Sequence, residues 1–367
     1  MTELFRTRTA LLAAVALFFG LIVPGASAQT PDCGPIVRTS QVTRGMIGEG
    51  LTVVQGTTPE TFGVEVLGVL KNGIGVGRDM IIVDVDAPFI DEVGGIWQGM
   101  SGSPVYVDGR LLGSVSFGLA FTSSSIGGLT PAENLVDLVS LGEGASFAAD
   151  QPAAQQATVT GPLAAEIQRR VGGDSAAFTQ QGVQLRQLPL PLSVSGLASS
   201  RLDSLEDVMA EHGQSMTAYA GSSAEYRQVQ TTGSAPEPGE NLAVAQSLGD
   251  LTMAAVGTAT LECDGQVIGF GHPFTFAGPT IAGGALADAI TIVPDHVGAP
   301  FKLANIGRLF GTVDEDRLEG VRADVGNFPR RIPVTSTVQD LDLGTSREGR
   351  TDVITPDALP FAAAFHL

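Results

Sequence analysis

The residues with the strongest chemical signal in this chain form the segment Gly99-Met100-Ser101-Gly102-Ser103-Pro104. Small residues surround Ser101, as is typical of a nucleophilic serine whose backbone a substrate carbonyl must approach. The following residues predict two short strands, Val105–Val107 and Leu111–Ser116, joined by a turn at Asp108-Gly109. No helix is predicted after the serine, so a strand-to-helix nucleophile elbow is disfavoured. The alternative is that the glycines, Ser101 and Pro104 form only a tight turn.

The four histidines provide no metal site. His212, His272, His296 and His366 are scattered, without the His-x-x-x-His spacing or the paired cysteines that hold metal ions. His212 lies near the end of a predicted helix, where it complements the helix charge. We therefore expect no metal and no cofactor.

Two β-rich regions must position these residues. Strands separated by glycine turns are predicted from Thr39 to about Phe121, and a short helix follows from Thr130-Pro131 to Gly142. A second β-rich region begins with strands at Leu251–Val256 and Thr258–Leu261 and continues to about Val334.

The region between them is mixed. It contains predicted helices at Pro162–Val171 and Leu202–His212 and an extended segment at Leu188–Val194. Ala- and Gln-rich residues before it and a Pro-containing stretch at Gly233–Gly239 are typical of linkers. The predicted organisation is a signal at 1–28, a β unit at 29–142, a linker and mixed insertion at 143–240, a β unit at 241–340 and a tail at 341–367.

The N-terminus predicts export. Arg6 and Arg8 precede the apolar run Ala10–Val23, and Ala26-Ser27-Ala28 is a small-x-small cleavage site. The apolar run is short for a membrane span, so we expect no stable span after cleavage. The alternative is an uncleaved N-terminal anchor. The formal net charge of −19 disfavours nucleic acid and anionic lipid as partners.

The two cysteines, Cys33 and Cys263, predict one disulfide. An isolated pair in an exported protein more often forms a bridge than two free thiols, which remain the alternative. The bridge would connect the start of the mature chain to a position nine residues before His272.

The serine segment resembles the Gly-x-Ser-Gly-x-Pro loop of chymotrypsin-like peptidases. The longer stretch Gly94-Gly95-Ile96-Trp97-Gln98-Gly99-Met100-Ser101-Gly102-Ser103-Pro104, with Asp108-Gly109-Arg110-Leu111-Leu112-Gly113 after it, is similar to the serine segment of the SpoIVB-type sporulation serine peptidases. Gly257-Thr258 and Gly269-Phe270-Gly271-His272 resemble the histidine segment of that family. The resemblance implies a mainly β fold of two chymotrypsin-like barrels, with a small α/β insertion between them.

Carried onto this sequence, the resemblance makes Ser101 the nucleophile and His272 the general base. It places the acid at Asp86, with Asp84 as the fallback because strand alternation puts both side chains on one face. The amides of Gly99 and Ser101 would form the oxyanion hole. The alternatives are a loop histidine that satisfies only the backbone and, for Asp86 before Ala87-Pro88, a turn or cap residue.

The order of the two halves departs from the family pattern. Here the serine half precedes the histidine half, although chain order does not forbid a catalytic geometry. No PDZ-like domain is predicted, so the substrate and signalling role of the sporulation enzyme are not transferred. The leading hypothesis is an exported serine endopeptidase that acts on a protein or peptide, including its own chain. The alternatives are a catalytically silent binding or envelope-assembly module and, more weakly, an esterase.

Overall fold

The computed structural model describes residues 33–120, 122–141, 155–172, 176–211, 216–221, 230–294 and 299–366. The predicted signal at 1–28, His212 and His296 lie outside these residues. Over the ranges described, no helix combines the length and apolar character that a membrane crossing needs. The fold is mainly β, as predicted.

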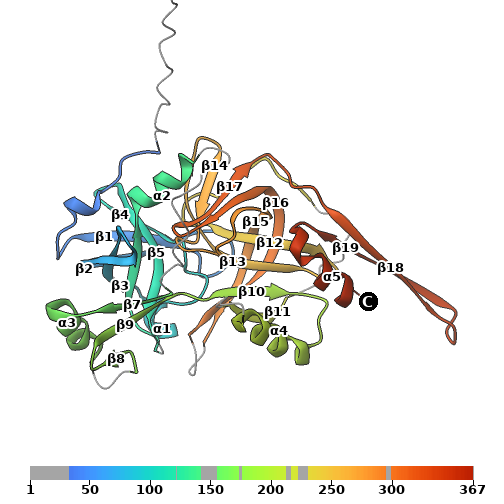
Figure 1. Cartoon of the computed structure of the whole chain (residues 1–367), viewed down its shortest axis with the longest axis horizontal. Helices are drawn as coiled ribbons and strands as arrows, with labels where there is room; N and C mark the ends of the chain where they lie inside the picture. Colours follow the sequence, from blue (N-terminus) through green and yellow to red (C-terminus); the bar gives the residue numbers. More distant parts are fainter. Residues whose placement is uncertain are drawn as a thin grey trace, which may run out of the picture. The chain divides into compact units, whose positions relative to one another are not determined.

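The first β unit is a closed barrel that carries the serine segment (Figure 1). Its described strands pair in an antiparallel ring in the order β1 (Ile47–Thr52), β2 (Glu60–Gly75), β3 (Arg78–Asp86), β6 (Ile126–Pro131), β5 (Arg110–Leu119) and β4 (Pro104–Val107), and β4 returns to β1. Alternation along β3 buries Val83 and Val85 in an apolar cluster. Trp97 and Met100 belong to the same cluster and anchor the serine segment to the barrel.

The second β unit is also a closed ring of strands. It runs through β12 (Asn241–Gly249), β13 (Met253–Cys263), β14 (Gln266–Gly269), β17 (Gly320–Val325), β16 (Phe301–Arg317) and β15 (Gly278–Val293), which returns to β12. The prediction of two strands before the Asp264-Gly265 turn was wrong, because β13 is continuous. Gly257 makes no turn there; a Cβ on it would lie 2.5 Å from Cδ1 of Phe270, so the glycine allows close packing.

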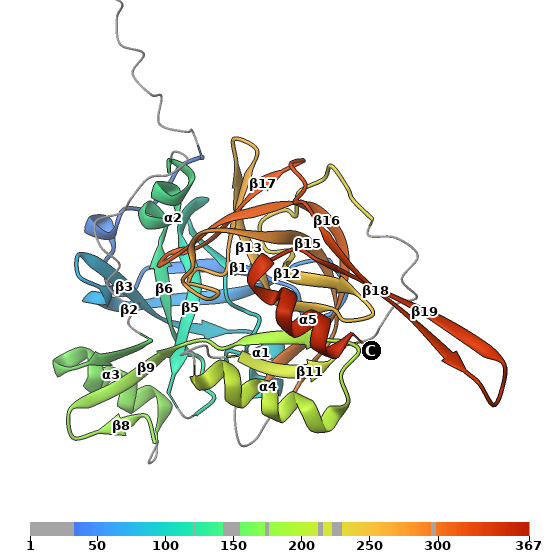
Figure 2. The ribbon, with the colours of Figure 1, turned by 45° about the vertical axis from the view of Figure 1, so that its right-hand side comes forward.

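The region between the barrels adds strands to both sheets. β7 (Gln156–Val159), β8 (Phe178–Thr179) and β9 (Gly182–Gln187) extend the first sheet from β5, whereas β10 (Leu190–Val194) and β11 (Met216–Ala220) extend the second from β13. Helices α3 (Gly161–Val171) and α4 (Ser199–Glu211) occur where helices were predicted. Figure 2 shows this light-green chain running from β9 towards β11 and α4.

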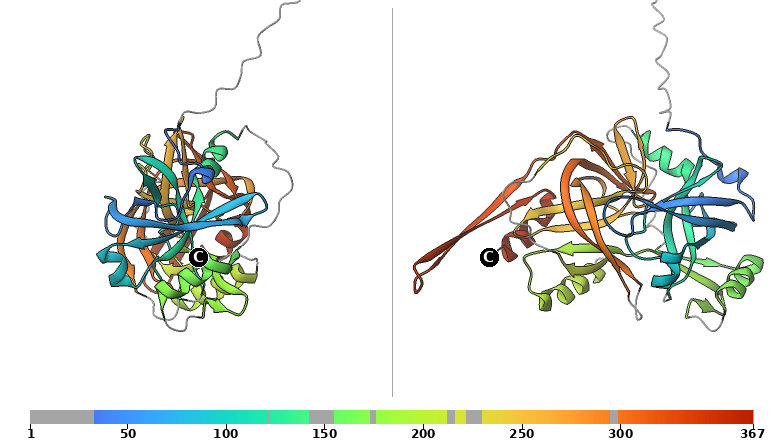
Figure 3. Two further views of the ribbon diagram at one scale, coloured as in Figure 1. Left: turned by 90° about the vertical axis from the view of Figure 1, so that its left-hand side faces the viewer. Right: turned by 180° about the vertical axis from the view of Figure 1, so that it is seen from behind.

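The C-terminal residues form elements that the sequence did not predict. β18 (Ile332–Asp340) and β19 (Thr345–Val353) make a hairpin, and β19 also pairs with β12. In Figure 3 the hairpin extends away from the second barrel. The short helices η1 (Thr39–Gln41), α1 (Pro88–Val93), η2 (Pro356–Ala358) and α5 (Leu359–Phe365) were also not predicted.

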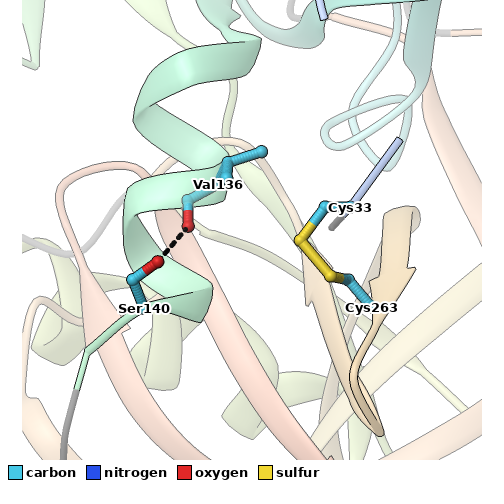
Figure 4. The surroundings of a disulfide bond; sticks show 4 residues. All are labelled: Cys33, Val136, Ser140 and Cys263. Atoms are coloured by element: carbon cyan, nitrogen blue, oxygen red, sulfur yellow. Dashed lines mark hydrogen bonds between the residues drawn. A yellow bond between two sulfur atoms is a disulfide. The ribbon is translucent and has the colours of Figure 1, made fainter. Parts of the chain in front are cut away.

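The predicted disulfide is present between Cys33 and Cys263, beside helix α2 (Ala132–Val139) (Figure 4). Cys263 belongs to a buried apolar cluster that includes residues of α2 and β14, and Cys33 packs against this cluster. At the end of this helix Ser140 Oγ donates a hydrogen bond of 3.4 Å to the carbonyl of Val136. The bridge therefore attaches the start of the described chain to the barrel that carries the histidine.

Candidate active site

The Ser101 segment is a tight turn between α1 and β4. Gly99 and Gly102 both have φ of +92°, a conformation that side chains disfavour. Gly102 donates its N–H to the carbonyl of Val115 at 2.8 Å, which holds the turn against β5. A Cβ on Gly102 would lie 2.0 Å from the carbonyl oxygen of Thr258 and 2.5 Å from the backbone nitrogen of Phe270. Only glycine permits this close approach of the serine turn to the second barrel.

Threonines of β13 fasten the serine turn to that barrel. The backbone N–H of Thr258 donates to the carbonyl of Ser101 at 2.8 Å, and its hydroxyl donates to the carbonyl of Gly99 at 3.1 Å. The hydroxyl of Thr260 donates to the carbonyl of Gly102 at 2.7 Å. These bonds cross between the barrels and fix Ser101 relative to the histidine half.

His272 follows β14 in the chain. The first barrel holds the loop that contains His272. The hydroxyl of Thr130 on β6 donates to the carbonyl of Gly271 at 2.5 Å. Gly271 has φ of +70°, and a Cβ there would lie 2.4 Å from the hydroxyl of Ser114. The loop before His272 therefore depends on glycine, as the serine turn does.

Ser101 and His272 meet across the two barrels. His272 Nε2 lies 2.8 Å from Ser101 Oγ, and His272 Nδ1 lies 2.8 Å from the carbonyl oxygen of Pro273. A carbonyl can only accept a hydrogen bond, so Nδ1 carries the proton. In the neutral ring Nε2 is then the acceptor for the hydroxyl proton of Ser101. This tautomer is the one that a general base requires.

Burial sets the charge state of His272. Its side chain is 1% exposed and Ser101 is fully buried. Burial lowers the pKa of His272 to about 4, although the bond to the carbonyl of Pro273 acts in the opposite direction. The imidazole is therefore neutral at pH 7, in the form that can accept a proton.

The structure does not bring the predicted acids to His272. Asp84 and Asp86 share one face of β3, as predicted, but it is the face opposite the buried valines. Asp84 pairs with Arg170 of α3 at 3.0 Å, and Asp86 is exposed at the end of the strand. The carbonyl of Pro273 occupies the Nδ1 position where a triad aspartate would bind. Within the described residues, no carboxylate hydrogen-bonds the His272 ring.

The predicted oxyanion-hole amides lie in the serine turn. Within the described ranges, neither Gly99 N–H nor Ser101 N–H donates a hydrogen bond to another backbone group.

A buried lysine next to this turn was not predicted. Lys302 of β16 is fully buried, its Nζ donates to Asn241 Oδ1 at 2.8 Å, and its backbone N–H donates to the carbonyl of Gln98 at 2.9 Å. A Cβ on Gly99 would lie 2.8 Å from Cβ of Lys302 and 3.1 Å from Cγ of Pro191. Burial lowers the pKa of Lys302 to about 7. Lys302 and Pro191 therefore pack against the turn that contains Ser101. Lys302 is the single lysine of β16, but the strand carries several other charged residues, so no feature of the sequence singled it out.

No cation-binding cluster accompanies the pair. Among the described residues, no three His, Cys, Asp or Glu side chains group in a way that could hold a metal ion.

The fold is mainly β and consistent with a chymotrypsin-like barrel, and the buried serine hydroxyl faces the histidine with the hydrogen-bond geometry of a nucleophile and its base. The family model described as SpoIVB peptidase S55 matches residues 19–130. This match contains the serine segment and ends before the histidine segment, and it supports the predicted resemblance to the SpoIVB-type serine peptidases. No curated protein and no solved structure matches the chain.

Proposed function

We propose that this protein is an exported serine endopeptidase that forms an acyl-enzyme at Ser101 with His272 as its general base. The observation that carries the proposal is the 2.8 Å contact between His272 Nε2 and Ser101 Oγ. The Nδ1–H of the same imidazole donates to the carbonyl of Pro273, which leaves Nε2 as the acceptor. The serine peptidase family supports the same chemistry.

In the proposed mechanism His272 Nε2 takes the hydroxyl proton of Ser101 as Oγ attacks the scissile carbonyl. The amides of Gly99 and Ser101 bind the oxyanion of the tetrahedral intermediate. The imidazolium then gives its proton to the leaving amine, and an ester to Ser101 remains. Water activated by His272 hydrolyses this ester and returns the serine.

Substrate access requires a movement of the packing around the serine turn, because Ser101 and His272 are buried. Pro191 lies in the segment that joins the two barrels, and Lys302 lies in β16. A shift of either would uncover Gly99 and the amide beside it. The substrate class that the peptidase family supports is a protein or peptide, which includes the chain itself.

Export is part of the proposal. The N-terminal pattern of arginines, apolar run and small-residue site is typical of a signal peptide. The Cys33–Cys263 disulfide suits an oxidising compartment. The acidic composition disfavours nucleic acid as a partner.

A catalytically silent binding module is the second candidate. The burial of both Ser101 and His272, together with the solvent-facing position of Asp86, favours it. The two candidates differ in whether the chain breaks peptide bonds.

The test is hydrolysis of an unfolded protein substrate by the mature, oxidised chain. We expect fragments from the wild type and from Ser103→Ala, a buried neighbouring serine, and none from Ser101→Ala or His272→Ala. Circular dichroism of each variant shows that it is folded. A folded wild type that releases no fragments, or a Ser101→Ala variant that cleaves as well as wild type, would contradict the peptidase proposal.

A further inference from the structure

We propose that Asp316 serves as the acid of this site and acts on His272 through the peptide group between Pro273 and Phe274. This inference rests on the proposed peptidase function and assigns a positioning residue to it. Asp316 is the last residue but one of β16 and is 1% exposed.

One peptide group connects the carboxylate to the imidazole. The Pro273 carbonyl oxygen lies 2.8 Å from His272 Nδ1. The N–H of the same peptide unit, on Phe274, donates to Asp316 Oδ1 at 2.8 Å. The described residues thus form an unbroken chain of hydrogen bonds from Ser101 Oγ through the imidazole and the peptide to the carboxylate.

The second carboxylate oxygen holds the rest of the loop. Asp316 Oδ2 accepts the backbone N–H of Thr275 at 2.7 Å, its hydroxyl at 2.9 Å and the N–H of Ala277 at 3.2 Å. These bonds fix the loop that follows His272. Gln187 adds a weaker bond of 3.4 Å from its side-chain amide to the carbonyl of Pro273.

The arrangement performs the two tasks of a triad aspartate. It keeps the proton on Nδ1, because the loop presents a carbonyl there and the carboxylate holds that loop in place. It also stabilises the imidazolium, because a negative charge at the amide end of a peptide polarises the carbonyl at its other end. Burial raises the pKa of Asp316, but the three backbone N–H groups and the hydroxyl that donate to it act in the opposite direction, because they stabilise the charged carboxylate.

Asp316→Asn tests the relay. The amide keeps one acceptor for Phe274 N–H but loses the charge, so the polarisation falls. We expect the rate constant for labelling of Ser101 by a fluorophosphonate to fall by about 10- to 100-fold, as is typical when a group behind a catalytic side chain is removed. Thr275→Ala is the matched control: it removes one bond to the same carboxylate, leaves the relay peptide intact, and should lower the rate less than about threefold.

Titration of His272 by NMR separates a relay from a merely structural role. The pKa of His272 should be lower in folded Asp316→Asn than in wild type, because the imidazolium loses a negative charge, and should stay at the wild-type value in Thr275→Ala. Equal pKa values in wild type and Asp316→Asn would overturn the relay.

The same measurements distinguish failure of the relay from failure of the peptidase proposal. A labelled wild type with an equally labelled Asp316→Asn variant refutes the relay and leaves the function standing. An unlabelled wild type refutes the function, and the NMR titration still tests the relay. If Asp316→Asn does not fold, the ¹⁵N chemical shifts of the His272 imidazole in the wild type test the relay, because they report which ring nitrogen carries the proton. The relay requires a protonated Nδ1 and an unprotonated Nε2. The opposite tautomer would overturn it.

Discussion

Replacing Gly102 by alanine tests the contact between the serine turn and the second barrel. The added Cβ would lie 2.0 Å from the carbonyl oxygen of Thr258, and real Cβ contacts are not closer than 3.0 Å, so the two barrels must separate locally by about 1 Å. The left-handed φ costs about 1–2 kcal/mol. The overpacking costs about 1–3 kcal/mol more. We therefore expect Gly102→Ala to lower the free energy of unfolding by about 2–5 kcal/mol.

Gly109→Ala is the matched control. Gly109 has φ of +71° in the turn between β4 and β5, and nothing lies within 4 Å of the position of its missing Cβ. The same backbone penalty and the same change in the unfolded chain apply, so the difference between the variants isolates the clash. We expect Gly109→Ala to cost about 1–2 kcal/mol.

Urea denaturation and labelling of Ser101 provide the readouts. A displacement of about 1 Å breaks the 2.8 Å contact between Ser101 and His272, and misplacement on that scale costs about 100-fold in rate. Folded Gly102→Ala should label about 100-fold more slowly than wild type, and Gly109→Ala at the wild-type rate. Equal urea midpoints and equal labelling rates for the two variants would refute the packing of the serine turn on Thr258.

Other predictions concern stability. Changing Cys33 and Cys263 together to serine should lower the free energy of unfolding by about 5 kcal/mol, because the bridge closes a loop over a sequence separation of 230 residues; an unchanged urea midpoint would contradict this. His272 is protonated in the unfolded chain below pH 6.5 and in the folded chain only below about 4. Stability should therefore fall by about 3 kcal/mol as the pH drops from 6.5 to 4, and this loss should be absent from His272→Gln when both proteins are denatured in urea across that range. The pKa of Lys302 is lowered from 10.5 to about 7. Stability should fall by about 5 kcal/mol from pH 10.5 to 7, and Lys302→Met should not show this component; equal pH slopes in both proteins would exclude a buried amine.

The serine turn and its hairpin could be predicted because their signals are local. Glycines, a proline and alternating apolar residues determine the turn and the strands over a few positions. The helices that became α3 and α4 and the disulfide were predicted on similar grounds, from periodicity and from a single pair of cysteines. The prediction that Ser101 pairs with His272 depended on two sequence motifs that resemble those of one family.

The acid of the site could not be predicted in this way. Alternation correctly placed Asp84 and Asp86 on one face of a strand, but only the closed barrel shows that this face is the outer one. Asp316 lies 44 positions after His272 and reaches its loop because β15 and β16 are long paired strands. The available signal was the run of three acids at the end of β16, Asp314-Glu315-Asp316. The continuous β13 also explains why the prediction of two separate strands, Leu251–Val256 and Thr258–Leu261, was wrong, whereas the Asp264-Gly265 turn after them is present.

The most direct test of the central claim, that Ser101 and His272 form a working pair across two barrels, is the intact mass of the mature oxidised protein after fluorophosphonate treatment. We expect one adduct, on the peptide that contains Ser101, in the wild type and in Ser103→Ala. We expect none in folded Ser101→Ala or folded His272→Gln. A folded wild type without adduct, or a His272→Gln variant labelled at the wild-type rate, would show that the two residues do not form a working pair.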